Sequence, residues 1–236
     1  MSGHSRLHAE IAAALAPHGL HPRGFARFPG GAGGPLLDDG RSACLVLLIG
    51  NVGGSMWRPF CDWRAAEPGR AGANPLDNRS KAVIGAIAAG IGATAFYPSD
   101  PPYQPFQRWA MLAEGLKASP LGILIHPALG LWHGYRGALG FAEHVFEGEA
   151  SSGPSRPHPC DGCTDRPCLA ACPAGAVAAD RFDVAACREF LASDAGREGC
   201  MDKGCHARAA CPVGSGFRYP EGQLRFHMEA LGPPPG

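Results

Sequence analysis

One run of the chain, Cys160-Asp-Gly-Cys163-Thr-Asp-Arg-Pro-Cys168-Leu-Ala-Ala-Cys172-Pro173, holds four of the ten cysteines and ends in Cys-Pro. A second set also ends in Cys-Pro and consists of Cys187, Cys200, Cys205 and Cys211-Pro212. Four thiolates hold one iron–sulfur cubane, and in two-cluster ferredoxins the cysteine before the proline ligates the other cluster. The eight cysteines therefore predict two [4Fe–4S] clusters.

The residues between the cysteines explain how several thiolates can meet around one site. Asp161-Gly162 and Arg166-Pro167 supply turns, and the Leu/Ala segment from Cys168 to Cys172 predicts a short helix that Pro173 ends. Cys172 then points away from its own loop, as a crossover requires. The crossover predicts one cluster on Cys160, Cys163, Cys168 and Cys211, and the other on Cys172, Cys187, Cys200 and Cys205.

Two other uses of the cysteines stay open. Four residues separate Cys163 from Cys168, where the ferredoxin run has two, and the second set is also loosely spaced. Zinc sites take C-x2-C pairs with cysteine or histidine partners, but they lack the terminal Cys-Pro. A disulfide framework belongs to secreted proteins, and the start Met1-Ser-Gly-His-Ser-Arg has no apolar core of a signal peptide. Both runs favour clusters over these alternatives.

Composition limits what surrounds the cysteines. The chain has 236 residues, more than a bare ferredoxin needs, and this length predicts one to two domains. Lys+Arg and Asp+Glu balance at 21 each, so charge gives no support for nucleic acid as a partner. The longest weakly polar stretch, residues 82–96, is shorter than the ~20 residues of a membrane span. We therefore expect a soluble, cytoplasmic protein without membrane contact.

A stretch that mixes Gly, Ser and Pro marks the domain boundary. It covers residues 148–159 and predicts a linker. Residues 1–147 before it then form one domain. After it we expect a small ferredoxin-like iron–sulfur domain at 160–220 and a C-terminal tail at 221–236.

The first domain shows helices and strands in alternation. A continuous apolar run at residues 44–50 predicts a strand buried on both faces. Residues 104–117 carry apolar side chains at helical spacing. The other expected elements are a helix over 8–16, a helix through 81–89 capped by Asp77 or Asn78, and strands at 93–97 and 121–126. The alternation predicts an α+β (α/β-like) layer around one sheet.

Two stretches resemble known families. Residues 125–137, Ile-His-Pro-Ala-Leu-Gly-Leu-Trp-His-Gly-Tyr-Arg-Gly, resemble the core of cobalamin-processing chaperones of the cobalamin C type. The cysteine runs, with Cys187-Arg-Glu-Phe-Leu between them, are similar to epoxyqueuosine reductase, a corrinoid domain followed by two [4Fe–4S] clusters. The resemblance implies a nitroreductase-like corrinoid domain, with base-off cobalamin reduced through the clusters. Epoxyqueuosine reductase also has a helical-repeat tail that binds tRNA. The present sequence lacks that tail, so no action on tRNA is expected.

Candidate cofactor-binding residues lie in two places. Gly50, Gly53, Gly54 and Ser55 end a predicted strand, where their N–H groups can face a phosphate or a corrin amide; a plain glycine turn is the alternative. The second place is formed by His126, Trp132, His133 and Arg136. Aromatic planes and a guanidinium can line a flat macrocycle, but a hydrogen-bonded structural histidine and a half-buried strand explain the same residues.

Two functions are consistent with these patterns. In the preferred one, an enzyme, the clusters deliver low-potential electrons to a corrinoid, or alternatively a flavin, in the first domain. Its partners would be an upstream ferredoxin or flavoprotein donor and a small-molecule or corrinoid substrate. In the other, the chain is a ferredoxin-type electron carrier whose first domain docks a redox partner. No residue is assigned a catalytic role.

Overall fold

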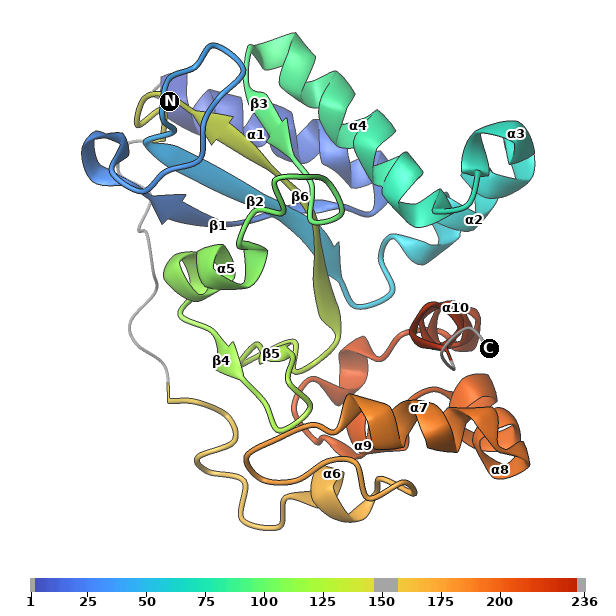
Figure 1. The fold of residues 1–236 in the computed structure, drawn as a ribbon. Coiled ribbons are helices and arrows are strands. Elements are labelled where there is room, and N and C mark those ends of the chain that lie inside the picture. The colour runs from blue at the N-terminus through green and yellow to red at the C-terminus, as the bar shows by residue number, and fades with distance from the viewer. Residues whose placement is uncertain (1–2, 147–156, 233–236) are drawn as a thin grey trace. The chain divides into compact units, whose positions relative to one another are not determined.

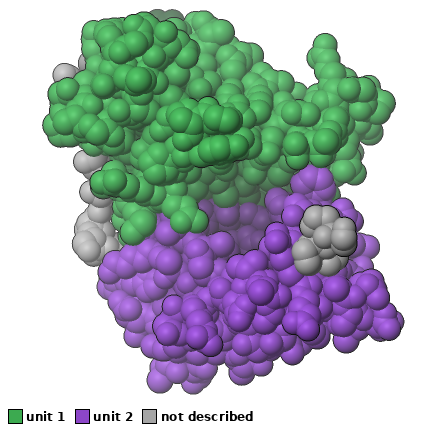
Figure 2. Space-filling view, in the orientation of Figure 1, with its two compact units in different colours: residues 1–115, 134–156 green, residues 116–133, 157–236 purple. Residues whose placement is uncertain are grey.

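The computed structural model describes residues 3–146 and 157–232, and it divides into two compact units. The first unit comprises Met1–Gly115 and Gly134–Arg156, and the second comprises Leu116–His133 and Pro157–Gly236, each within its described part (Figure 2). The segment Leu116–His133 therefore belongs to the second unit, although it lies inside the stretch expected to form the first domain. The expected linker at 148–159 falls mostly outside the described residues.

A four-stranded antiparallel sheet forms the centre of the first unit (Figure 1). Its order is β1-β2-β6-β3, and β1 pairs antiparallel with β2, as β3 does with β6. The Cys44 N–H donates to the Phe141 carbonyl at 2.9 Å, which continues the pairing of β2 with β6. The strands are β1 (His21–Arg27), β2 (Leu45–Val52), β3 (Thr94–Phe96) and β6 (His133–Phe141). The unit is thus α+β, and its antiparallel pairing departs from the α/β-like alternative.

Strand β2 is buried on both faces, as its continuous apolar run predicted. Leu45, Leu47 and Ile49 are 0% exposed, and so are the residues between them. Helices α1 (Gly3–Leu15) and α4 (Pro75–Ile91) lie on one face of the sheet and α5 (Phe106–Glu114) lies on the other (Figure 1). Because both faces are covered, the central strand needs no polar alternation.

Several helix ends follow from single residues. The turn Ala16–His18 closes α1, and Gly19 takes a left-handed φ of 63° after it. Helix α4 begins at Pro75 with Asn74 as N-cap, earlier than the cap expected at Asp77 or Asn78, because proline is preorganised for the first helical position. Gly92, at φ 66°, ends α4. The short helices α2 (Trp57–Ala66) and α3 (Pro68–Ala71) connect β2 to α4.

The second unit consists of a β-hairpin and short helices. Strands β4 (Lys117–Ala118) and β5 (Leu124–Ile125) pair only with each other. The strand expected over 121–126 is therefore reduced to two residues outside the main sheet, since an apolar run does not specify its pairing partner. The helices are α6 (Pro167–Ala170), α7 (Val184–Ala192), α8 (Asp194–Gly196), α9 (His206–Ala210) and α10 (Glu221–Leu231). Helix α10 occupies most of the stretch expected as a tail.

Two small apolar clusters hold the second unit together. One contains Leu121, Ile125, Leu131, Val177 and Ala207, and the other contains Leu191, Cys200 and Met228. Seven of the eight clustered cysteines pack on or belong to these groups: Cys160, Cys168, Cys172, Cys187, Cys200, Cys205 and Cys211. Such small cores leave the thiols a large share of the unit's interior. Within the described residues, no helix is long and apolar enough to cross a membrane.

Candidate metal centre

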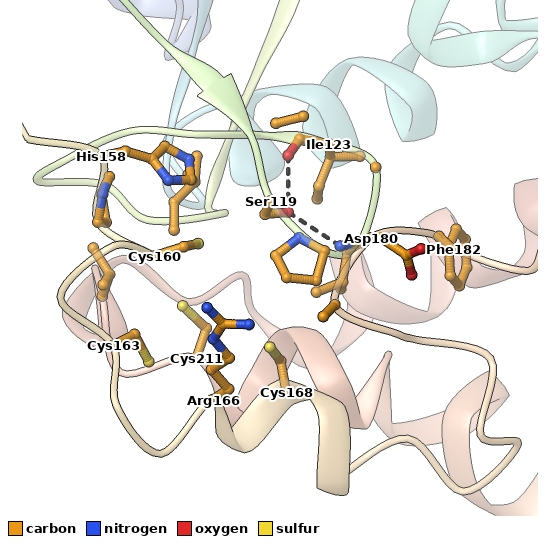
Figure 3. Close-up of a pocket in the computed structure, with 18 of the residues that line it drawn as sticks. Ser119, Ile123, His158, Cys160, Cys163, Arg166, Cys168, Asp180, Phe182 and Cys211 are labelled. Atoms are coloured by element: carbon orange, nitrogen blue, oxygen red, sulfur yellow. Dashed lines mark hydrogen bonds between the residues drawn. The ribbon is translucent and has the colours of Figure 1, made fainter.

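A cavity of about 760 Å³ in the second unit is lined by four cysteines, here called the first cysteine group: Cys160, Cys163, Cys168 and Cys211. Figure 3 shows their side chains around this space. The remaining wall comes from the β4–β5 hairpin, from residues 158–168 and 179–184, and from Pro212 and Val213. The cavity lies wholly within one unit. It brings together residues that are about 50 positions apart in the sequence.

Turns place the first three thiols of this group. The Asp161 N–H donates to the His158 carbonyl at 2.9 Å, and the Cys163 N–H donates to the Cys160 carbonyl at 3.3 Å, so the chain reverses as its Asp-Gly sequence predicted. Arg166 then adopts φ 38° and ψ 54°, the left-handed conformation. Pro167 begins α6, which carries Cys168. The fourth thiol, Cys211, follows the end of α9.

The pKa values reveal which thiols of the first group influence one another. Burial raises the pKa of Cys160 to about 11, and nearby Cys211, Cys168 and Cys163 raise it further. For Cys211 burial is again the largest cause, and Cys168 and Cys163 add to the increase. Burial followed by Cys163 raises the pKa of Cys168. All four thiols therefore lie within electrostatic reach of each other.

The remaining four thiols form the second cysteine group: Cys172, Cys187, Cys200 and Cys205. Burial raises the pKa of Cys187 to about 11, with further increases from Cys205, Cys172 and Cys200. Cys187 lies in α7, and Cys200 lies in a π-helical turn, Arg197–Met201. Turns of this kind occur frequently at functional sites. Burial raises the pKa of Cys200 and Cys205 as well, and Cys172 contributes to both shifts.

The eight cysteines thus come together in two groups of four, with the membership that the crossover of the two Cys-Pro cysteines predicts. Cys172 belongs to the first run in the sequence but lies with the second cysteine group. Cys211 belongs to the second run but lies with the first cysteine group. All ten cysteines of the chain lie in the described part and are free thiols. Ligation of iron by these groups stays a prediction.

The spacing of the donors differs from that of a closed single-ion site. At a Zn–S distance of about 2.3 Å, tetrahedral geometry sets neighbouring sulfurs about 3.8 Å apart. Among residues 3–146 and 157–232, no three His, Cys, Asp or Glu side chains are grouped so as to hold one metal ion. A cubane binds each thiolate through a different iron, so its ligands stand farther apart. Binding of a cubane by either group stays a prediction.

The two cysteine groups share one apolar core. Cys160, Cys168 and Cys211 pack against the cluster around Leu131 and Ala207, and so do Cys172 and Cys205 of the second group. Thiols from both groups therefore border the same few side chains. The shared cluster therefore connects the two groups through a common set of apolar contacts.

The glycine loop after β2 has structural contacts. The Asn51 side-chain amide donates to the Gly53 carbonyl at 2.8 Å. Ser55 Oγ donates to the Gly19 carbonyl at 2.6 Å and accepts from the Val52 N–H at 3.2 Å. A Cβ on Gly50 would lie 2.1 Å from the Gly134 carbonyl oxygen. Position 50 therefore needs glycine because the backbone of β6 approaches it closely. These residues and Gly54 line neither the cavity of the first cysteine group nor a second cavity beside Leu37 and Gly140.

The aromatic candidates belong to the second unit. His126 Nδ1 accepts the N–H groups of Ala128 and Leu129, both at 3.0 Å, so it caps a turn. The His133 ring lies 5.9 Å from the His126 ring, centroid to centroid. Trp132 is 1% exposed, and its ring is covered by Arg208. These contacts make Trp132 a packing residue with no open face for a macrocycle.

Arg136 belongs to the first unit. Its guanidinium forms an ion pair with Asp77 and donates through Nε to Ser80 Oγ at 3.3 Å. Both partners lie in α4, so Arg136 joins β6 to that helix. These contacts supply a structural role that the short motif did not reveal.

Two cavity residues were not selected by sequence reasoning. His158 and Arg166 both line the cavity of the first cysteine group, beside Cys160 and Cys168 (Figure 3). His158 lies in the Pro-rich stretch expected as linker, and Arg166 was interpreted only as part of a turn. Proximity in sequence to a cysteine motif is the signal that would have found them.

Comparison with known proteins adds no family to these observations. No protein-family model and no curated protein sequence matches the chain. Function is therefore inferred from the two cysteine groups themselves.

Proposed function

We propose that the chain is a redox protein with two [4Fe–4S] clusters, one held by each cysteine group. The observation that carries this proposal is the division of eight thiols into two groups of four with crossed membership. That division is what a pair of cubanes needs from a single chain. Loosely spaced intervals in the sequence do not prevent it, because the turns and short helices adjust the approach of each thiol.

The protein's own residues supply the environment that such clusters require. The thiols are mostly shielded from water, and the small apolar cores lie directly behind them. When bound, the clusters supply one-electron transfer, with potentials set by charge, hydrogen bonds and solvent exposure. A low-potential ferredoxin or a flavoprotein is the expected donor.

The finer assignment concerns the electron acceptor. We propose that the first unit is a nitroreductase-like domain that takes a corrinoid, with a flavin as the alternative. The support is the similarity of the cysteine runs to a corrinoid protein, together with an α+β unit whose antiparallel sheet is covered by helices on both faces. The other resembling stretch, residues 125–137, lies mostly in the second unit and adds no support to this assignment. The contacts of Trp132 and Arg136 add nothing to it.

Metal analysis tests the cluster proposal. The full chain, reconstituted anaerobically, should contain about eight iron and eight sulfide per chain. Cys163→Ser should remove up to half of the iron through the first group, and Cys187→Ser should do the same through the second. The matched control is the double variant Cys44→Ser with Cys61→Ser, which should keep the parent's iron. Stoichiometric zinc without iron would refute the proposal.

A separate titration tests the acceptor. Hydroxocobalamin or flavin is added to the anaerobic, iron-loaded protein, and binding is followed in the visible spectrum. Stoichiometric binding of either cofactor supports a reductase. If neither binds while the iron content is full, the chain is a ferredoxin-type electron carrier.

A further inference from the structure

His158 carries a buried ring nitrogen without a partner in the cavity of the first cysteine group. Its side chain is 10% exposed, and its Nε2 atom has no hydrogen bond within the described residues. Figure 3 shows the imidazole beside Cys160 at one side of the cavity. A buried polar atom left unpaired costs about 1–3 kcal/mol, so the position indicates a partner that the protein chain alone does not provide.

The neighbouring carboxylate does not provide that partner. Asp161 Oδ1 lies 3.6 Å from His158 Nδ1, the other ring nitrogen. This distance is too long for a hydrogen bond, and it leaves Nε2 on the opposite edge of the ring. His158 also lines the cavity of the first cysteine group, where sulfur bound to iron would supply an anionic acceptor.

Arg166 is the second unusual residue of the same cavity. It is one of two non-glycine residues with positive φ in the described chain, and it immediately precedes the helix that carries Cys168. A bulky residue pays for this conformation, and such strain collects at functional sites. Its guanidinium forms no ion pair or side-chain hydrogen bond in the described residues, and Figure 3 shows it among the cysteines.

We propose that His158 and Arg166 raise the reduction potential of the cluster on the first cysteine group. This inference rests on the proposed function. One-electron reduction adds a negative charge to a cluster that is already anionic. An N–H donated to its sulfur by His158, and the positive charge of Arg166, both stabilise the reduced state relative to the oxidised state.

The second cysteine group offers a different environment. Cys200 is 6% exposed and packs with Leu191 and Met228. Arg188, the nearby cation, donates through Nε to the Leu231 carbonyl at 3.2 Å. Its histidine, His206, lies against Gly199. Burial in apolar surroundings opposes added negative charge at both groups. The contribution of His158 is what would set the cluster on the first group at the higher potential.

The difference in reduction potential between the two proposed clusters would determine which of them is reduced first. With a cluster on each group, an electron passing from the second to the first would oxidise the second and reduce the first, with no proton or bond change required. The first cysteine group borders the cavity, whereas Cys200 of the second group packs with Leu191 and Met228. In this proposal the one-electron-reduced protein would hold its electron at the group that borders the cavity.

A potentiometric titration followed by electron paramagnetic resonance tests this inference on the full, iron-loaded chain. His158→Phe keeps a ring and removes the N–H, so the higher of the two midpoint potentials should become more negative. Arg166→Gln should shift the same midpoint in the same direction. His158→Gln keeps an N–H donor and Arg166→Lys keeps a positive charge. Each of these variants should therefore show a smaller change in the higher midpoint potential than His158→Phe or Arg166→Gln.

Two controls make the outcome decisive. Iron content of every variant is measured first, and His206→Phe should leave the higher midpoint unchanged. If the parent loads iron but neither His158→Phe nor Arg166→Gln moves the higher midpoint, or if both midpoints move together, this inference is wrong and the cluster proposal survives. A parent that binds no iron overturns both.

Discussion

The guanidinium carbon of Arg208 lies 4.5 Å from the centroid of the Trp132 ring. The same carbon lies 4.5 Å from the Tyr219 ring, so the cation is held between two aromatic faces. Arg208 also donates through Nε to the Leu131 carbonyl at 3.2 Å. Because Arg208 is in α9, which leads to Cys211, these contacts fix the segment Leu116–His133 to the cysteine-bearing part of the second unit.

Trp132→Ala should therefore destabilise the second unit. Truncation of a buried tryptophan typically costs about 3–5 kcal/mol, a large loss for a unit with such small apolar clusters. Urea denaturation of the iron-loaded protein, followed by the visible absorbance of the clusters, should give a clearly lower midpoint. The control is Leu112→Ala, because Leu112 is 50% exposed in α5. An unchanged midpoint for Trp132→Ala would contradict this packing role.

A close approach of two turns should control loading of the first cysteine group. A Cβ on Gly130, which has φ 60°, would lie 1.9 Å from the Val213 carbonyl oxygen. Gly130→Ala must therefore displace the chain two residues after Cys211, and reconstituted iron should fall toward half of the parent value. Gly162→Ala is the matched control, since a Cβ there meets no atom within 4 Å. Full iron in Gly130→Ala would show that the approach is not needed.

The sequence predicted those parts of the protein that depend on local chemistry. The burial of β2 follows from its unbroken apolar run. The two Cys-Pro pairs also predict that Cys172 groups with the second set of thiols and Cys211 with the first, and ligation of clusters by these groups stays a prediction. The pairing of β5 and the position of Trp132 depend on partners distant in the sequence, which periodicity does not specify. Trp132 has the same residue type whether it lines a cofactor or fills a core. His158 belongs to no motif, and only the cavity reveals it.

A buried ion pair should stabilise the first unit. Arg23 and Glu114 are joined at 2.8 Å with side chains 5% and 11% exposed. Glu114→Ala leaves the Arg23 charge buried without its carboxylate, which costs about 3–5 kcal/mol. Urea denaturation followed by far-ultraviolet circular dichroism should detect the loss. Glu10→Ala, which breaks an exposed pair with Arg6, should leave the midpoint unchanged.

Stability should decrease in alkali because of two buried phenols. Burial, and then the negative Asp100, raise the pKa of Tyr97 to about 12. Burial and Glu114 raise the pKa of Tyr135 further still. The neutral phenols favour the folded state below the unfolded pKa of about 10. The free energy of unfolding should therefore be level below pH 10 and fall as pH rises from 10 toward 12 and beyond.

Phenylalanine variants check the source of this decrease. Tyr135→Phe removes the group with the larger shift, so its stability should depend less steeply on pH above 10. Tyr103→Phe is the control, because that side chain is 68% exposed. Parallel curves for the parent and Tyr135→Phe would assign the alkaline loss to other groups.

Removal of the metal should open the second unit at two separate places. The apolar clusters are small, so the proposed thiolate-bound metal would supply much of the unit's stability. Trypsin should cut the apo protein after Lys117, the one trypsin site within Leu116–His133, as well as beyond Pro157. Iron-loaded protein should be protected at both places. Equal cutting at Lys117 in both forms would show that the hairpin is stable without metal.

The division of the chain also determines the order in which its parts become available during synthesis. The hairpin segment, with Leu121, Ile125 and Leu131, is translated before the cysteines with which it packs. At about 5–20 residues per second, the ribosome needs roughly 4–16 s to extend from Leu131 to Cys211. Strand β6 of the first unit also follows Leu131 in the chain, so the first unit gains its inner strand while the hairpin still lacks its cysteine-bearing partners. During that interval the apolar residues of the hairpin have no packing partner from the rest of their own unit.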